Sequence, residues 1–393
     1  MHQQDSVLPL KMLLFNFHAA NTIIVSFLPL FLQYKGLEGT EIGWVLAIGP
    51  FAAIFSQPLW GYMSDKYQTV KWALFTSLMG LIIVSTIFFQ MDSLLMFLVV
   101  GAIFFFFSSP VGALGDSLAQ RRAHDLNISF GGIRMWGSAG FAISSLLAGA
   151  LFSVIGIQYV LIPYLFFGIV ALIISLQLKD VKSSSKVKIK LSDIKPLLNN
   201  RALLIFLALL MFITITHRLN DSYMSIYLER LGGGEGLIGM SWFIAVTSET
   251  LVFAFAGKWF RKFHPLIFII VAGFLYSLRW FIYSLVADPA WIVGFQVLHG
   301  VTFGVLYLAA FDYVTRLIPK QLQSTGHMMF TAVFFGVSGI IGSLLGGALI
   351  DTLGGSKLYF IIGCSALVGT ICFTLYHILP YGKEIRPVAA KQH

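Results

Sequence analysis

Six ionisable residues interrupt otherwise apolar stretches of this sequence, three of them acids and three of them arginines. They are Asp116, Asp221, Glu249, Arg134, Arg218 and Arg279. An ionised side chain at the centre of a bilayer costs about 2.5 to 3.5 kcal/mol even on a lenient scale, so such groups are usually paired or line an aqueous cavity. The balance of charges favours a neutral polar ligand, or an acid that is carried with a proton.

The densest polar group is His217-Arg-Leu-Asn-Asp221, near the centre of the apolar run 203–228. On a helix, residues three and four apart share one side, so His217, Arg218 and Asp221 can all meet. Asp221 can then be held ionised by Arg218, or it can share a proton with His217 as a coupled pair. A permanent structural pair of Arg218 with Asp221 fits the same spacing, and the sequence leaves these alternatives open.

Glu249 differs from the other acids because no basic residue lies within two helical turns of it on its own segment. A carboxyl whose nearest cation changes with conformation is suited to carrying a proton. We therefore expect Glu249 to be the proton carrier, with Asp221 as the second candidate. His18 and His299 are candidates for direct contact with substrate or proton, and hydrogen-bonded packing is the alternative for both.

The elements that position these residues follow from the composition. The chain has 393 residues, of which 58% are hydrophobic and 11% charged, and its mean hydropathy is +0.85. A membrane-spanning helix needs about 20 apolar residues. Twelve such runs are centred near residues 22, 52, 81, 106, 145, 168, 215, 247, 274, 302, 336 and 367. The sequence thus predicts an all-α membrane protein with twelve transmembrane helices.

The net charge of +9 reflects membrane topology and does not indicate a nucleic-acid partner. With the N-terminus placed inside, 20 Lys and Arg fall on that side, while only Lys35, Arg230 and Lys357 fall on the other. This is the positive-inside bias. We expect a multi-pass protein of the cell (inner) membrane with both termini cytoplasmic. Its partners would be the bilayer, a small-molecule substrate and a proton, and it would act as a monomer without metal or cofactor.

The chain also divides into two similar halves. We predict a six-helix bundle over 1–180, a Lys- and Ser-rich cytoplasmic linker over 181–200, a second bundle over 201–380 and a cytoplasmic tail over 381–393. At a shift of 196 to 199 residues, His18 and Asn21 match His217 and Asn220, Gly43 matches Gly239, and 145–151 matches 343–349. Such a parallel repeat lets two bundles rock about a site at their interface. We expect the two His-x-x-Asn pairs to face each other there.

The loop after the second span resembles a signature of the major facilitator superfamily. Gly61-Tyr-Met-Ser-Asp65-Lys66, followed by Lys71, is similar to its pattern of Gly, three residues, Asp and a basic residue. Gln68 stands where the second glycine of that pattern is usual. The resemblance implies the fold of two pseudo-symmetric six-helix bundles and a gating role for Gly61, Asp65 and Lys66.

Within that superfamily, the segment from Phe130 to Gly137 resembles the Phe-Gly-x-x-Arg-Met-x-Gly of the lactose permease-like symporters and their phenylpropionate and nucleoside permease relatives. Asp116 precedes Arg134 by 18 residues, as a glutamate does there. The resemblance implies that Asp116 and Arg134 bind substrate. It further implies that Glu249, Arg279 and His299 take part in proton coupling.

Several residues depart from the pattern of those symporters. Thr302 stands where they carry a coupling glutamate, Phe141 replaces their sugar-stacking tryptophan, and the lysine of their eleventh span has no counterpart. Galactoside specificity and the usual coupling route are therefore not expected.

These observations predict a proton-coupled symporter that imports a sugar, nucleoside or aromatic acid. Its substrate-binding residues would be Asn21, Asp116, Arg134, Phe141, His217 and Asp221. A proton-driven exporter of drugs or metabolites is the first alternative. A membrane enzyme or scaffold is the second, which would require a catalytic or metal-ligand cluster that we do not find in the sequence. The sequence contains no G-x-x-x-x-G-K-[ST] loop, so drive by ATP is not expected.

Overall fold

A computed structural model of the chain describes residues 7–180, 195–319 and 322–379, and this part is helical with no strand. The first half holds α1 (Leu8–Tyr34), α2 (Gly39–Lys66), α3 (Val70–Phe88), α4 (Leu94–Asp125), α5 (Phe130–Ile155), η1 (Ile157–Tyr159) and α6 (Leu161–Leu176). The second half begins with α7 (Lys195–Leu198), α8 (Arg201–Arg230), α9 (Glu235–Trp259), η3 (Phe260–Lys262) and α10 (Pro265–Leu285). It continues with α11 (Pro289–Phe295), η4 (Gln296–Leu298), η5 (Gly300–Gly304), α12 (Val305–Leu317), α13 (Gln323–Thr331), η7 (Ala332–Val337), α14 (Ser338–Thr352) and α15 (Gly354–Ile378).

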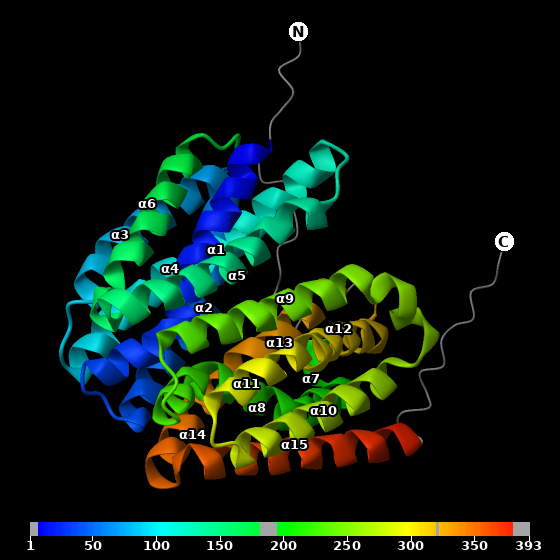
Figure 1. Cartoon of the computed structure of the whole chain (residues 1–393). Coiled ribbons are helices and arrows are strands. Elements are labelled where there is room, and N and C mark those ends of the chain that lie inside the picture. Colours follow the sequence, from blue (N-terminus) through cyan, green and yellow to red (C-terminus); the bar gives the residue numbers. More distant parts are fainter. Residues whose placement is uncertain (1–6, 181–194, 320–321, 380–393) are drawn as a thin grey trace, which may run out of the picture.

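Twelve helical spans in the described residues are long and apolar enough to cross a membrane, and each contains one of the predicted centres. The prediction of an all-α protein with twelve transmembrane helices is therefore confirmed. Helices α1 to α6 lie together, and α8 to α15 lie together beside them (Figure 1). The tail 381–393 and most of the linker 181–200 lie outside the described residues, so the domain bounds stay a prediction.

The sequence repeat corresponds to two equivalent helix–helix contacts between the bundles. A Cβ atom added to Gly43 of α2 would lie 2.5 Å from the Ser343 carbonyl oxygen of α14. One added to Gly239 of α9 would lie 2.3 Å from the Ser145 carbonyl oxygen of α5. Each glycine thus lets two helix backbones approach closely. Because these residues are equivalent in the repeat, the α2–α14 and α9–α5 contacts are pseudo-symmetric copies.

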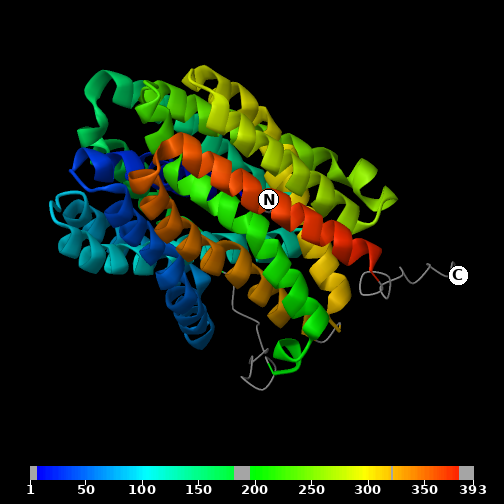
Figure 2. The same cartoon turned by 90° about the horizontal axis from the view of Figure 1, so that it is seen from below.

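Hydrogen bonds join the bundles at the end where α1 and α8 finish, which we call the closed end. The Asp351 carboxylate of α14 accepts from the backbone N–H groups of Gly39 and Thr40 at 3.0 and 2.7 Å, and from Thr40 Oγ1 at 2.8 Å. The Tyr223 hydroxyl of α8 donates to the Gly39 carbonyl oxygen at 3.1 Å. Helices α5 and α9 diverge away from this end (Figure 1), whereas α8, α14 and α15 run side by side within the second bundle (Figure 2).

Candidate functional site

A cavity of about 220 Å³ lies between the two bundles and takes its lining from both. Side chains of α1 and α5 form one wall, and those of α8, α9, η5 and η7 form the other. Eight of the residues singled out in the sequence line it: His18, Arg134, Phe141, His217, Arg218, Asp221, Glu249 and His299. Charged groups that are far apart in the sequence therefore meet in one space.

Helix α8 brings the polar group His217–Asp221 to the cavity. As expected from their spacing of three and four residues, Arg218 and His217 both lie close to Asp221. Arg218 Nη1 lies 2.9 Å from Asp221 Oδ2, and His217 Nε2 lies 3.4 Å from the same oxygen. The side chains of His217 and Asp221 are 4% and 11% exposed, so this carboxylate is largely shielded from bulk solvent. One carboxylate oxygen thus serves both a guanidinium and an imidazole.

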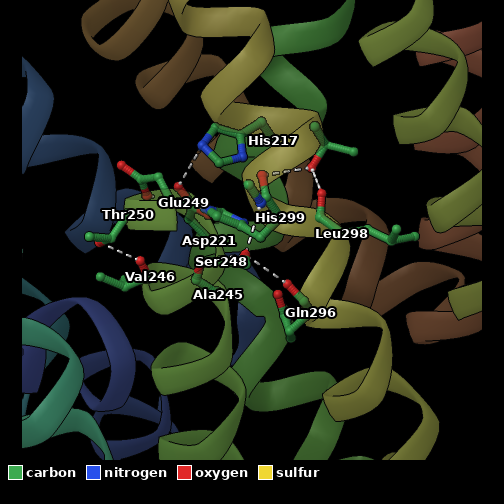
Figure 3. A network of polar contacts seen from close by, with 12 residues as sticks. His217, Asp221, Ala245, Val246, Ser248, Glu249, Thr250, Gln296, Leu298 and His299 are labelled. Carbon is green, nitrogen blue, oxygen red and sulfur yellow. Dashed lines mark hydrogen bonds and ion pairs between the residues drawn. The ribbon is translucent and has the colours of Figure 1, made fainter. Parts of the chain in front are cut away.

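Glu249 of α9 meets His299, which lies between η4 and η5. Glu249 Oε2 lies 3.7 Å from His299 Nε2, and the carboxyl side chain is 23% exposed. Figure 3 shows this pair beside His217 and Asp221, with the side chains converging from α8, α9 and the segment around His299. The centroids of the His217 and His299 rings are 5.6 Å apart. The two acid–imidazole pairs therefore form one polar group.

The position of His299 depends on an irregular stretch of backbone. The chain passes from α11 through η4 into the π-helical segment η5, and π-helical turns are rare and frequently mark functional sites. Ser248 Oγ accepts from the Gly300 N–H at 2.9 Å, which fastens this stretch to α9. A Cβ atom on Gly300 would lie only 2.4 Å from the Ser248 carbonyl oxygen. The contact of His299 with Glu249 thus requires glycine at 300.

Replacement of Gly300 by valine is expected to push η5 away from α9. Overpacking of this kind costs about 1 to 3 kcal/mol, and thermal unfolding in detergent should occur at a lower temperature. Gly294→Val in the neighbouring α11 is the matched control, because no atom lies within 4 Å of a Cβ atom there. Equal unfolding temperatures for the two variants would contradict the close packing of Gly300.

Arg279 lies behind the cavity wall instead of lining it. Its side chain is fully buried and donates from Nε to the Tyr283 hydroxyl at 3.0 Å, from Nη1 to Thr302 Oγ1 at 3.4 Å, and from Nη2 to Gln296 Oε1. Thr302, at the position of the missing family glutamate, is thus a neutral partner of this arginine. Gln296 and Thr302 flank His299 in the sequence. Arg279 is therefore placed to position that segment.

The first bundle contributes Arg134 of α5, whose Nε lies 2.9 Å from Asp116 Oδ1 of α4. Arg134 lines the cavity, and Asp116 supports it from behind. A Cβ atom on Gly137 would lie 2.5 Å from His18 Cδ2 and 2.6 Å from Arg134 Nη1. Gly137 therefore makes the space in which His18 and Arg134 lie together.

The expected facing of two His-x-x-Asn pairs needs correction. The repeat-related His18 and His217 both line the cavity, but Asn21 and Asn220 are not among its lining residues. Asn220 accepts a hydrogen bond from the Tyr359 hydroxyl of α15 at 3.0 Å and so faces away, into the second bundle. Residues three apart on a helix are offset by about 60°, so His217 can line the cavity while Asn220 turns toward Tyr359 of α15.

The signature loop lies at the end opposite to the closed end. Gly61, Asp65 and Lys66 fall in the last turns of α2, and no atom lies within 4 Å of a Cβ atom built on Gly61. Gln68 adopts a φ of 54°, the left-handed backbone that glycine takes more easily at this position of the signature. The gating role of these residues stays a prediction.

Three aromatic residues of the cavity escaped the sequence analysis: Trp242, Phe303 and Phe335. Trp242 of α9 meets Phe141 of α5 across the interface, with ring centroids 5.9 Å apart. Helical spacing could have found it, because Trp242 precedes Glu249 by seven residues and so shares its face. Phe335 contacts the Arg218 guanidinium, 5.9 Å from the ring centroid.

Comparisons with known proteins agree with this architecture. The MFS_1 like family matches residues 7–361. An uncharacterized transporter of Bacillus subtilis (strain 168), YwbF, is 30% identical over 360 residues, covering 89% of this chain and 89% of that protein. The maltose permease of Geobacillus stearothermophilus is 27% identical over 353 residues, covering 88% and 89%. The crystal structure of the nucleoside transporter NupG has a TM-score of 0.85 and covers 94% of this chain and 98% of that one; at 16% identity, it supports the fold alone.

The twelve spans, the paired bundles with a cavity between them and the family match over 7–361 lead to one conclusion. The chain belongs to the MFS_1 like family and is a multi-pass membrane transporter of small molecules, not an enzyme.

Proposed function

We propose that this transporter is a symporter that brings a small polar solute into the cell together with a proton. A sugar, a nucleoside or an aromatic acid is the proposed class of solute. The observation that carries the proposal is the pair of acid–imidazole contacts, Glu249 with His299 and Asp221 with His217, in the wall of a cavity between two bundles. Alternating access would expose those groups to each side of the membrane in turn.

The lining of the cavity supports the class of solute. Arg134 and Arg218 face it together with Asp221 and Glu249, so its formal charges balance and suit a neutral solute or an acid with its proton. Buried polar atoms without a partner in the described structure include Arg218 Nε, His18 Nε2 and Asp221 Oδ1, which hydroxyl groups of a solute can satisfy. The rings of Phe141 and Trp242 offer apolar faces beside them.

The names of two similar proteins point the same way, since one is a maltose permease and another a nucleoside transporter. The charge bias of the loops supports cytoplasmic termini in the cell membrane. With that orientation, the closed end is extracellular and the structure represents an inward-facing state. We propose that Asp116 orients Arg134, that Arg134 and Arg218 contact the solute, and that the protein works as a monomer without a cofactor.

Counterflow in proteoliposomes tests this proposal. Purified protein is supplied in turn with maltose, uridine, 3-phenylpropionate and the lipophilic cation ethidium as labelled solutes. We expect exchange of one of the first three, and accumulation of that solute when the outside is made acidic. Exchange of ethidium alone, with its extrusion from the vesicles driven by an acidic outside, would instead support the exporter, because an antiporter moves solute out as protons move in.

A further inference from the structure

The two histidines of the second bundle each face a carboxylate through the same ring atom. His217 Nε2 lies 3.4 Å from Asp221 Oδ2 and His299 Nε2 lies 3.7 Å from Glu249 Oε2. The pairs come from α8 in one case, and from α9 and the segment between η4 and η5 in the other. Three segments of the chain thus present two copies of the same acid–imidazole pair to one space (Figure 3).

The two imidazole rings are also neighbours held by a common support. Their centroids are 5.6 Å apart, and Phe303 stacks on His217 at 4.7 Å and lies 5.4 Å from His299. The Nδ1 atoms of both histidines are buried with no hydrogen-bond partner in the described structure. A neutral imidazole has one donor and one acceptor nitrogen, so a ring that faces a carboxyl through Nε2 can exchange a proton at Nδ1.

We propose that His217 links Glu249 to Asp221, so that the carried proton is shared between both carboxyls through the two imidazoles. The inference rests on the proposed proton symport and adds a route for the proton between the two acid–imidazole pairs. It differs from a scheme in which Glu249 holds the proton alone and the His217–Asp221 pair only binds solute.

The transfer conserves protons and moves no electrons. The Glu249 carboxyl gives its proton to His299 Nε2, and His299 releases one from Nδ1 to His217 Nδ1, directly or through one water molecule. His217 then gives the proton on Nε2 to Asp221 Oδ2. The net result is one proton moved from Glu249 to Asp221, with both imidazoles still neutral and ready to return to their first tautomers.

Charged and titratable groups on every neighbouring element act on this chain of four residues. They are Arg218 on α8, Tyr276 and Arg279 on α10, Tyr307 on α12, Tyr359 on α15, and His18 and Arg134 across the cavity on α1 and α5. Arg218 matters most because its Nη1 lies 2.9 Å from Asp221 Oδ2. A proton on Asp221 removes the charge that holds Arg218, which frees the guanidinium to bind a solute oxygen. Protonation of Asp221 and binding of the solute would thus be coupled through Arg218.

Infrared spectroscopy of purified protein in nanodiscs tests the linkage without any solute. The Asp221 carboxyl band is identified by its loss in Asp221→Asn, and its pH midpoint is measured with and without Glu249→Gln. Coupled groups shift each other by about one pH unit or more. In the wild-type background, we expect Glu249→Gln to shift the pH midpoint of the Asp221 band by that amount. In the His217→Gln background the same substitution should cause less than half of this shift, and in the His327→Gln background it should cause the full shift.

His327 is the matched control because it lies at the start of the eleventh span, with its Nε2 2.8 Å from Thr315 Oγ1 and outside the cavity lining. His299→Gln, which breaks the same chain at its other imidazole, should reduce the shift as His217→Gln does. His299→Gln therefore provides the test if His217→Gln fails to fold. An undiminished shift after either substitution in a folded protein would overturn the linkage.

Transport measured on the same variants separates this inference from the proposed function. If the wild-type protein shows no pH-driven uptake, the symport proposal fails, whatever the infrared shift. If the wild-type protein and His217→Gln both accumulate solute uphill to the same ratio, the symport stands and the linkage through His217 is wrong.

Discussion

Replacement of Glu249 by glutamine is expected to abolish pH-driven accumulation while leaving counterflow intact. The amide keeps the size and the hydrogen-bonding groups of the side chain but cannot take up a proton. One proton per solute supports about tenfold accumulation for each pH unit of gradient, since 1.4 kcal/mol is a factor of ten. With an acidic outside, wild-type vesicles should approach that ratio, whereas Glu249→Gln vesicles should reach only equal concentrations on the two sides.

The matched control is Glu235→Gln, the same change at the first residue of the same helix α9, at the closed end and outside the cavity lining. It should accumulate solute as the wild-type protein does. Uphill accumulation by Glu249→Gln would show that another group carries the proton. Loss of counterflow as well would assign Glu249 to solute binding and remove it from coupling.

The architecture was predictable from the sequence because lipid imposes strong constraints. Each span needs a long apolar run, and each buried charge needs a partner or a cavity. Those rules gave the twelve helices, and they led to the acids and arginines that meet between the bundles. The repeat matched Gly43 with Gly239, and the structure places these two glycines at equivalent close contacts between the bundles.

Other parts of the site were hidden from the sequence for physical reasons. Phe303 and Phe335 are apolar residues in apolar runs, so their residue type does not distinguish a cavity wall from a lipid-facing surface. Asn21 and Asn220 match in the repeat, yet the Tyr359 hydroxyl binds Asn220 within the second bundle. A repeat preserves the position of a residue along the helix, but the orientation of its side chain depends on the neighbours that it contacts. The irregular backbone at η5 likewise depends on the contact with Ser248 and leaves no periodic signal.

Replacement of Asp351 by alanine is expected to open the closed end. The carboxylate accepts two backbone bonds and one hydroxyl bond from Gly39 and Thr40 of the other bundle. Hydrogen bonds to a charged group contribute about 1.5 to 3 kcal/mol each. Because the Asp351 side chain is 23% exposed, the lower value is appropriate. Three bonds at this value amount to about 4.5 kcal/mol, and their loss would shift the balance between closed and open forms roughly 1000-fold.

Distances between spin labels at Tyr34 and Leu353, which are 57% and 41% exposed at this end, would report the change. The two native cysteines, Cys364 and Cys372, would first be replaced by serine. Asp92→Ala is the control, because Asp92 pairs with Lys35 at 2.5 Å inside the first bundle. An unchanged distance distribution in Asp351→Ala would show that the carboxylate does not hold the bundles together.

The repeat makes this prediction more specific. Among the described residues, the hydrogen bonds to Asp351 lie at the α2–α14 contact, which we call the α2–α14 seam, and have no equivalent at its pseudo-symmetric copy, the α9–α5 seam. The position equivalent to Asp351 is Ser153, whose hydroxyl donates to the Ala150 carbonyl oxygen of its own helix. The α9–α5 seam is instead held by close packing at Gly149 and Gly239. We therefore expect Asp351→Ala to lengthen the distance between the labels at Tyr34 and Leu353 more than a distance measured between labels at Val154 and Gly234. Equal lengthening would mean that the bundles rock as rigid bodies and that the charge acts on both seams together.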